Sequence, residues 1–241
     1  MTTRDGFLGG RLTLAQPARG FRAGSDAVLL AAACPARPGH SVLDLGCGVG
    51  AAMYCLAVRV PDLALTGVER DAEAAALARQ NGGAEVVEAD ARDLPPRLRR
   101  AFDHVICNPP YFLAGHGSPA GAPARESALR EGAPDDLARW ARTACRRAAP
   151  KGSVTFVIRT DRLADLLAAL PLGGIAILPV AGRAGAAAGR VVVQGIQGAR
   201  APLRLLPPLV MQVGADHESD RDGHTPEAQA ILRDGTALPL R

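Results

Sequence analysis

Residues 41–51, SVLDLGCGVGA, limit the possible folds more than any other stretch of the sequence. The apolar run SVLDL is typical of a buried strand, and Gly46, Gly48 and Gly50 then allow a tight turn into the helix that follows. A strand that passes through such a turn into a helix begins a βαβ unit, and the free amides at the helix N-terminus can face a ligand. We therefore expect a parallel sheet with a binding site at this turn.

The rest of the chain repeats the alternation of strand and helix. Strands are predicted at 41–46, 63–69, 84–90, 102–107, 153–158, 174–180 and 190–197, with a further extended piece at 202–212. Helices are predicted at 25–34, 51–60, 72–81, 135–149, 161–170 and 226–233. This order predicts an α/β, Rossmann-like fold: a seven-stranded, mostly parallel sheet with helices on both faces. Because no long helix is predicted between 182 and 213, we expect antiparallel strands at the edge of the sheet.

We interpret residues 1–241 as a single domain, because no repeat and no long linker interrupts the pattern. Residues 1–40 are expected to form an N-terminal extension with a buried helix, and residues 41–241 the core; residues 1–24 show little periodicity. The longest uncharged run has 17 residues and contains two prolines, which is too short and too broken to span a bilayer. With no signal-peptide pattern at MTTRDGF, we expect a cytoplasmic protein without a membrane segment.

The charge of the chain is basic, with a net charge of +4 and a pI of about 9.1. Of the 28 basic residues, only Lys151 is a lysine. Arginine suits a polyanion because its planar fork donates two hydrogen bonds to one phosphate; an arginine-rich codon usage explains the count equally well. The five cysteines are odd in number and form no C-x-x-C, so we expect reduced thiols and no metal site.

The end of the strand predicted at 102–107 is unusual, because it leads into Asn108-Pro109-Pro110-Tyr111. Each proline fixes its own φ and disfavours a helical conformation in the residue before it. The chain therefore leaves the strand on a stiff path that holds Asn108 and Tyr111 in a fixed relation, which indicates a functional site.

Two carboxylates follow the glycine turn at the ends of the next strands. Glu69, about twenty residues on, is placed to accept hydrogen bonds from ribose hydroxyls, and Asp90 to accept one from an adenine amino group. Gly46-x-Gly48-x-x-Ala51 also satisfies the loose dinucleotide fingerprint. The G-x-G-x-G spacing, Asp44 before it and Asp90 after it favour a nucleotide cofactor other than NAD.

With these motifs in this order, the chain resembles the class I S-adenosylmethionine-dependent methyltransferases. The N-P-P-Y tetrad resembles that of members that methylate a nitrogen conjugated to a ring or carbonyl. Five segments are similar to those of one bacterial group, the tRNA adenine-N6 methyltransferases that modify adenosine 37 of a valine tRNA. These segments are AGSDAVLL, NPPYF, ARESAL, RAPLRLLPPLVMQ and HTPEAQAILRDG. The resemblance implies S-adenosylmethionine as cofactor, S-adenosylhomocysteine as product, tRNA as partner and no metal.

The resemblance also implies roles for individual residues. The cofactor would contact Asp44, Gly46, Gly48, Gly50, Glu69, Asp90 and Asn108. The catalytic residues would be Asn108, Pro109, Pro110 and Tyr111, and the substrate would contact Tyr111, Phe112 and Arg125. An exocyclic adenine nitrogen is a poor nucleophile, so two acceptors, the Asn108 side-chain carbonyl and the Pro109 backbone carbonyl, would free its lone pair. Tyr111 would stack on the unpaired base.

Other functions fit parts of the sequence. A glutamine-N5 methyltransferase acting on a release factor uses the same motif, but only about 40 residues precede the first core strand, which leaves little room for a helical recognition domain. Three alternatives remain: a guanine-N2 methyltransferase acting on ribosomal RNA, a non-catalytic nucleic-acid-binding protein and an NAD-dependent oxidoreductase. The sequence leaves open the tRNA species, the base, the oligomeric state, the arginines that contact RNA, and whether residues 113–124 close over the substrate.

Overall fold

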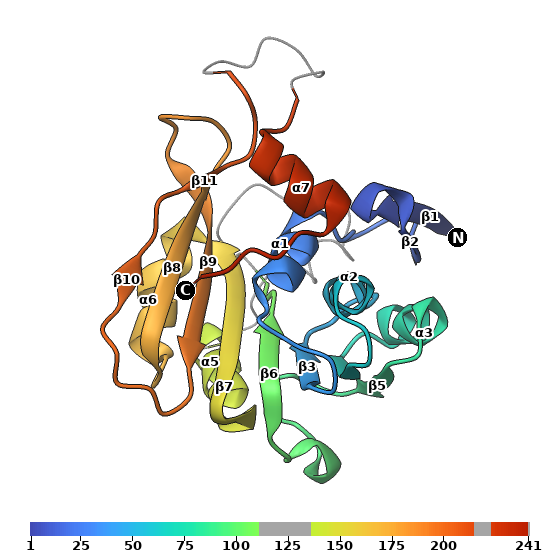
Figure 1. The fold of residues 1–241 in the computed structure, drawn as a ribbon. Helices are drawn as coiled ribbons and strands as arrows, with labels where there is room; N and C mark the ends of the chain where they lie inside the picture. The colour runs from blue at the N-terminus through green and yellow to red at the C-terminus, as the bar shows by residue number, and fades with distance from the viewer. Residues whose placement is uncertain (111–135, 215–222, 241) are drawn as a thin grey trace.

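A mixed sheet runs through the middle of the protein (Figure 1). The structure, a computed structural model, describes residues 1–110, 136–214 and 223–240. Within them the sheet has nine strands in the order β10-β8-β9-β7-β6-β3-β4-β5, and β11 also pairs with β8. The strands are β3 (Ser41–Leu45), β4 (Ala64–Glu69), β5 (Glu85–Glu88), β6 (Phe102–Cys107), β7 (Ala148–Arg159), β8 (Gly173–Ala181), β9 (Ala188–Ile196), β10 (Arg204–Leu205) and β11 (Leu209–Val210).

The predicted α/β fold with a mostly parallel sheet is confirmed. Strands β7, β6, β3, β4 and β5 pair in parallel, so their carboxyl ends share one edge. The antiparallel strand is β9, which pairs with β7 on one side and β8 on the other, two positions in from the edge strand β10. The short connection between β8 and β9 explains its direction, because a parallel pair needs a crossover of a dozen or more residues.

Helices cover both faces of the sheet, as predicted. Side chains alternate between two cores along each strand: Val42 and Ile106 face one core, Leu43 and Cys107 the other. The first core is covered by α1 (Ser25–Ala33), α2 (Ala51–Arg59), α3 (Ala72–Asn81) and α7 (Pro226–Asp234). The second is covered by α5 (Asp136–Arg147), α6 (Leu163–Ala169) and the short 3-10 turn η2 (Pro96–Leu98).

The N-terminal residues are more ordered than their weak periodicity predicts. Strands β1 (Thr2–Phe7) and β2 (Leu12–Pro17) form an antiparallel hairpin outside the main sheet, in addition to the expected buried helix α1. The hairpin is fixed to the end of α3 by Asn81, whose side chain donates to Ala15 O (3.0 Å) and accepts from Ala15 N (2.7 Å). Most of the hairpin is exposed or half-buried, so its sequence lacks the continuous apolar run that marked the core strands.

Two further expectations concern redox state and membranes. All five cysteines are buried and none forms a disulfide, as predicted. In the part of the chain that the structure describes, no helix is long and apolar enough to cross a membrane.

Candidate active site

A cavity of about 440 Å³ lies where the carboxyl ends of β3, β4, β5 and β6 meet. Its wall is completed by the end of β2, which contributes Gln16, by the segment after it, which contributes Phe21, and by the start of α5, which contributes Asp136 and Trp140. The carboxyl edge of a parallel sheet is the usual place for a ligand site in this class of fold, and the volume suits a small-molecule ligand. This is where the sequence placed a binding site.

The glycine turn forms one wall of the cavity. Gly46, Gly48 and Gly50 have φ values of 69°, 55° and 86°, in the left-handed region that favours glycine. A Cβ on Gly46 would collide with the ring of Trp140, whereas a Cβ on Gly48 would meet open space. Gly50 caps α2, packs close to the ring of Tyr54 and is not among the lining residues. The geometry of the turn therefore depends on all three glycines, and two of them face the cavity.

Glu69 holds the turn at the end of β4. Its Oε2 accepts a hydrogen bond from Gly48 N (2.9 Å), and its Oε1 accepts one from Asp71 N (2.8 Å). An ionised carboxylate has about four acceptor positions, so each oxygen can accept one more hydrogen bond. The carboxylate is thus fixed by backbone amides and still able to bind hydroxyl groups of a ligand in the cavity.

Asp44 is the most unusual group in the site. Its side chain is buried, with only 2% of the residue exposed, and accepts a hydrogen bond from the Met53 backbone. Its Oδ2 has no hydrogen-bond partner among the described residues. Burial, and to a lesser degree the charge of Glu69, raise the pKa of Asp44 to about 7. A buried carboxylate oxygen without a partner, at the wall of a cavity, is suited to a cationic ligand group.

We expect Asp44→Asn to stabilise the ligand-free protein at alkaline pH. In the folded chain Asp44 keeps its proton up to a pH of about 7, whereas unfolded it ionises near its ordinary pKa of 3.8. Stability of the native chain should therefore fall as pH rises from about 4 to 7 and then level off. The gain from the substitution should grow by about 3 kcal/mol between pH 5 and pH 8, as measured by denaturant unfolding. An equal gain at both pH values would contradict a raised pKa.

Asp90 is engaged by a neighbour that the sequence analysis did not consider. Its two carboxylate oxygens accept hydrogen bonds from Arg92, with Nη2 at 2.5 Å and Nε at 2.9 Å. Arg92 Nη1 also contacts Asp136 Oδ1 at 2.6 Å, and Asp136 is almost completely buried. The hydrogen bonds from Arg92 lower the pKa of Asp90, so this carboxylate is ionised at neutral pH. The cluster Asp90–Arg92–Asp136 joins the end of β5 to the first turn of α5.

Asn108, Pro109 and Pro110 follow β6 and line the cavity. The structure therefore brings the end of this strand to the same cavity as the predicted cofactor residues Asp44, Gly46, Gly48, Glu69 and Asp90. Tyr111, Phe112 and Arg125 lie outside the described residues, so their predicted roles stay predictions.

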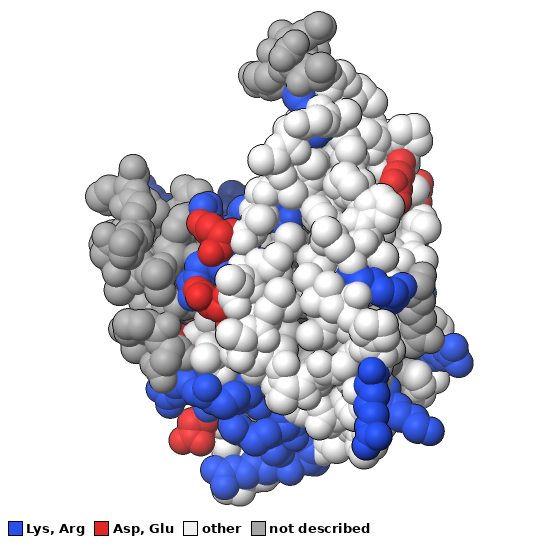
Figure 2. Space-filling view, turned by 90° about the vertical axis from the view of Figure 1, so that its left-hand side faces the viewer, with Lys and Arg blue, Asp and Glu red and all other residues white. Residues whose placement is uncertain are grey.

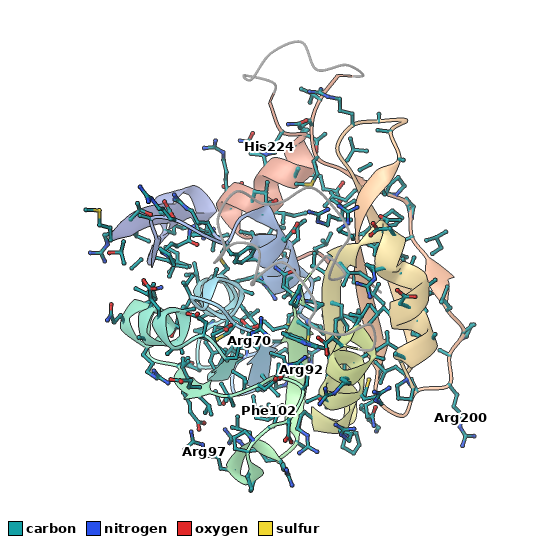
Figure 3. The ribbon with its side chains drawn as sticks, turned by 180° about the vertical axis from the view of Figure 1, so that it is seen from behind. Arg70, Arg92, Arg97, Phe102, Arg200 and His224 are labelled. Carbon is teal, nitrogen blue, oxygen red and sulfur yellow. The ribbon has the colours of Figure 1, made fainter. Side chains whose placement is uncertain are left out.

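Sequence reasoning missed several lining residues, among them Gln16, Phe21, Arg92 and Trp140. Gln16 accepts a hydrogen bond from Ala23 N (2.8 Å) and donates one to Asp5 Oδ2 (2.6 Å), so it ties the segment before α1 to the hairpin. Arg92 and Arg70, both labelled in Figure 3, line the same cavity. Trp140 is the single tryptophan of the chain, and this rarity could have marked it as a candidate site residue.

A metal site is not apparent. Within residues 1–110, 136–214 and 223–240, no group of three or more His, Cys, Asp or Glu side chains could hold a metal ion.

Comparison with known proteins connects this site to methyltransferases. Residues 21–122 match the family model described as the methyltransferase small domain. A tRNA1(Val) (adenine(37)-N6)-methyltransferase of Aeromonas hydrophila is 34% identical over 72% of this chain and 76% of the relative. The protein of the same name from Shewanella amazonensis is 31% identical over 89% of this chain and 91% of the relative.

Solved structures agree on the fold. A predicted O-methyltransferase of Agrobacterium tumefaciens is 27% identical and has a TM-score of 0.70, covering 89% of this chain and 98% of its own. A 16S rRNA N2 G1207 methyltransferase of T. thermophilus, solved with AdoMet and guanosine, is 20% identical with a TM-score of 0.54, covering 88% of this chain and 48% of its own. At that identity the second likeness concerns the fold alone.

Proposed function

The chain belongs to the family of the tRNA1(Val) (adenine(37)-N6)-methyltransferases, and from that membership we propose that it methylates N6 of an unpaired adenine, at position 37 beside the anticodon of a tRNA. The observation that carries the proposal is the position of Asn108-Pro109-Pro110, which lines the same cavity as the glycine turn, Asp44 and Glu69. A motif suited to nitrogen methylation thus faces a pocket suited to a nucleotide-like cofactor.

The residues of the cavity fit S-adenosylmethionine, which supplies an activated methyl group on a sulfonium sulfur. Asp44 Oδ2, buried and without a partner among the described residues, suits the positively charged amino group of the methionine portion. Backbone near Gly46 and Gly48 would lie along that portion because neither residue carries a side chain. Glu69 retains acceptor capacity for the two ribose hydroxyls.

Asp90 would face the adenine ring of the cofactor. Because Arg92 already donates to both of its oxygens, the carboxylate has little capacity left and a fixed orientation. Its contribution would be a single, well-oriented acceptor for the adenine amino group. Gly50 would act on the cofactor indirectly, by capping α2.

Asn108 and Pro109 would prepare the target nitrogen. Its lone pair is delocalised into the adenine ring, and two acceptors aimed at its hydrogens favour a pyramidal nitrogen with that lone pair free. The Asn108 side-chain carbonyl and the Pro109 backbone carbonyl would be those acceptors, and Pro110 would stiffen the backbone that carries them. Asn108 is neutral, so it accepts these hydrogen bonds without acting as a base. The gain comes from positioning and from hydrogen bonds that strengthen in the transition state.

The substrate base would rest on Tyr111, with Phe112 beside it and Arg125 near a phosphate. Stacking contributes roughly 1–3 kcal/mol per base, comparable to the cost of unstacking one. That cost is lowest for a base that is already unpaired, as in an anticodon loop. A tRNA substrate also implies a cytoplasmic location for the enzyme.

The substrate class is tested by transfer from labelled S-adenosylmethionine to three acceptors in parallel: unmodified bacterial tRNA, ribosomal RNA and a release factor. We expect label in tRNA alone. Label in the release factor would replace the proposal with glutamine methylation, and label in ribosomal RNA with guanine methylation. The named relatives favour neither alternative.

A further inference from the structure

Seven arginines form a continuous basic surface, which we call the arginine band. It consists of Arg97, Arg99 and Arg100 at η2 and of Arg139, Arg142, Arg146 and Arg147 on α5. Figure 2 shows basic side chains gathered along the lower part of the face that carries α5 and α6. The two parts of the band meet at the end of α5, where the charges of Arg146 and Arg99 add to burial in lowering the pKa of Arg147.

The helical part of the band follows from the pattern of α5. Arg139, Arg142 and Arg146 are exposed and spaced three and then four residues apart, so they lie on one face of the helix. The opposite face, with Leu137 and Ala141, is buried in the core. The stripe is about 10 Å long at 1.5 Å per residue, close to the rise of roughly three stacked nucleotides of one strand.

Ordinary structural roles explain only part of this charge. Cations at the carboxyl end of a helix are stabilising, which accounts for Arg146 and Arg147. Arg99 pairs with Asp93 (3.7 Å) and Arg100 with Glu85 (3.1 Å). The other members, Arg97, Arg139 and Arg142, have no acidic partner and no hydrogen-bonded side chain within the described part of the chain. An excess of like charge destabilises a compact state, so a partner that neutralises it is expected.

The band reaches the active-site cavity by two routes. Along α5, Arg139 directly precedes Trp140, and Trp140 lines the cavity. Along η2, a depression lined by Arg97 and Arg99, and also by Glu88 and Asp93, shares Ala89 and Asp90 with the wall of the cavity. A polymer held on the band would therefore lie beside the wall of the site.

We propose that the arginine band binds phosphates of the tRNA backbone next to the target adenine; this inference rests on the proposed function and adds the surface that holds the RNA. Guanidinium groups bind phosphates through paired hydrogen bonds, and contacts to phosphates position a nucleic acid without reading its sequence. The band would supply affinity, and the cavity would select the base.

The test compares two triple variants of the full-length protein. The band variant is Arg139→Ala, Arg142→Ala and Arg146→Ala. The control removes three arginines from elsewhere on the surface: Arg37→Ala, Arg200→Ala and Arg233→Ala, each exposed and without a side-chain ion pair in the described residues. Figure 3 shows Arg200 far from Arg97. The two variants carry the same net charge, so any difference between them reports position.

Binding of an unmodified tRNA transcript is measured over a series of salt concentrations, and KM for the same transcript is measured with S-adenosylmethionine. We expect the band variant to raise Kd and KM roughly tenfold or more and to lower the salt slope by roughly two to three. The control should change neither. The triple variant Arg139→Lys, Arg142→Lys and Arg146→Lys should recover most of the salt slope, since lysine keeps the charge.

Two other outcomes would contradict RNA binding by the arginine band. Equal losses in the band and control variants would show a non-specific effect of net charge, and no loss in the band variant would place the RNA elsewhere. Either result, obtained while the native chain methylates tRNA, overturns the inference and leaves the proposed function intact. A native chain that neither binds nor methylates tRNA would overturn both.

Discussion

Replacing Asn108 with alanine is expected to lower kcat for methyl transfer to tRNA by about a hundredfold or more, by analogy with the loss of one preorganised hydrogen-bonding group in other enzymes. The substitution removes one of the two acceptors that would free the lone pair of adenine N6. The loss should appear mainly in kcat, because the contact strengthens as the nitrogen becomes pyramidal. Single-turnover rates at saturating tRNA and cofactor measure it directly.

Two further measurements separate this effect from damage to the site. Calorimetric titration with S-adenosylhomocysteine should show a much smaller change in affinity than the change in kcat. Asn108→Asp keeps an acceptor oxygen but adds a charge to a site that already holds Asp44 and Glu69, so it should also be impaired. An alanine variant with native kcat would remove Asn108 from the mechanism.

Replacing Arg92 with methionine is expected to destabilise the protein by about 3–5 kcal/mol, the usual cost of removing one partner of a buried ion pair. Arg92 is 19% exposed in its side chain and faces Asp136, whose side chain is 4% exposed. Without the guanidinium, the buried Asp136 carboxylate loses its ion pair with Arg92, and Asp90 loses the neighbour that orients it. For a chain of this size the loss corresponds to a fall in Tm of about 6–20 °C.

A second substitution identifies the cause of that instability. In the double variant Arg92→Met, Asp136→Leu the buried carboxylate that Arg92 neutralised is absent, so much of the lost stability should return. Cofactor affinity should not return with it, because Asp90 remains without its partner. If the double variant is as unstable as Arg92→Met alone, the cost is one of packing and the ion pair contributes little.

The core of the fold could be predicted because its strands are buried on both faces. Such strands read as short, continuous apolar runs, and 102–107 was predicted with the bounds that β6 has. The boundary between α5 and β7 was harder to predict. The helix expected at 135–149 ends at Arg147, and β7 begins at Ala148. The boundary was misplaced because alanine alone does not distinguish the end of a helix from the start of a strand.

The parts of the site that escaped prediction depend on contacts distant in sequence. Arg92 contacts Asp136, 44 residues later, and no local pattern marks such a pair. The hairpin contributes Gln16 to the cavity although neither of its strands has a clear alternation of apolar and polar residues. Conversely, the glycine turn, Glu69 and Asn108 could be predicted because each is defined by a strand end and the few residues that follow it.

The most direct test of the proposed activity locates the methyl group. An unmodified valine tRNA transcript is incubated with labelled S-adenosylmethionine, digested to nucleosides and to short fragments, and analysed by mass spectrometry. We expect N6-methyladenosine in the fragment that contains position 37, and no label in a transcript with guanine at that position. Label in ribose methyl groups, as an O-methyltransferase would give, or on a base other than adenine, would contradict the assignment of Asn108-Pro109-Pro110 to adenine N6 chemistry. Label at N6 of another adenine would contradict position 37.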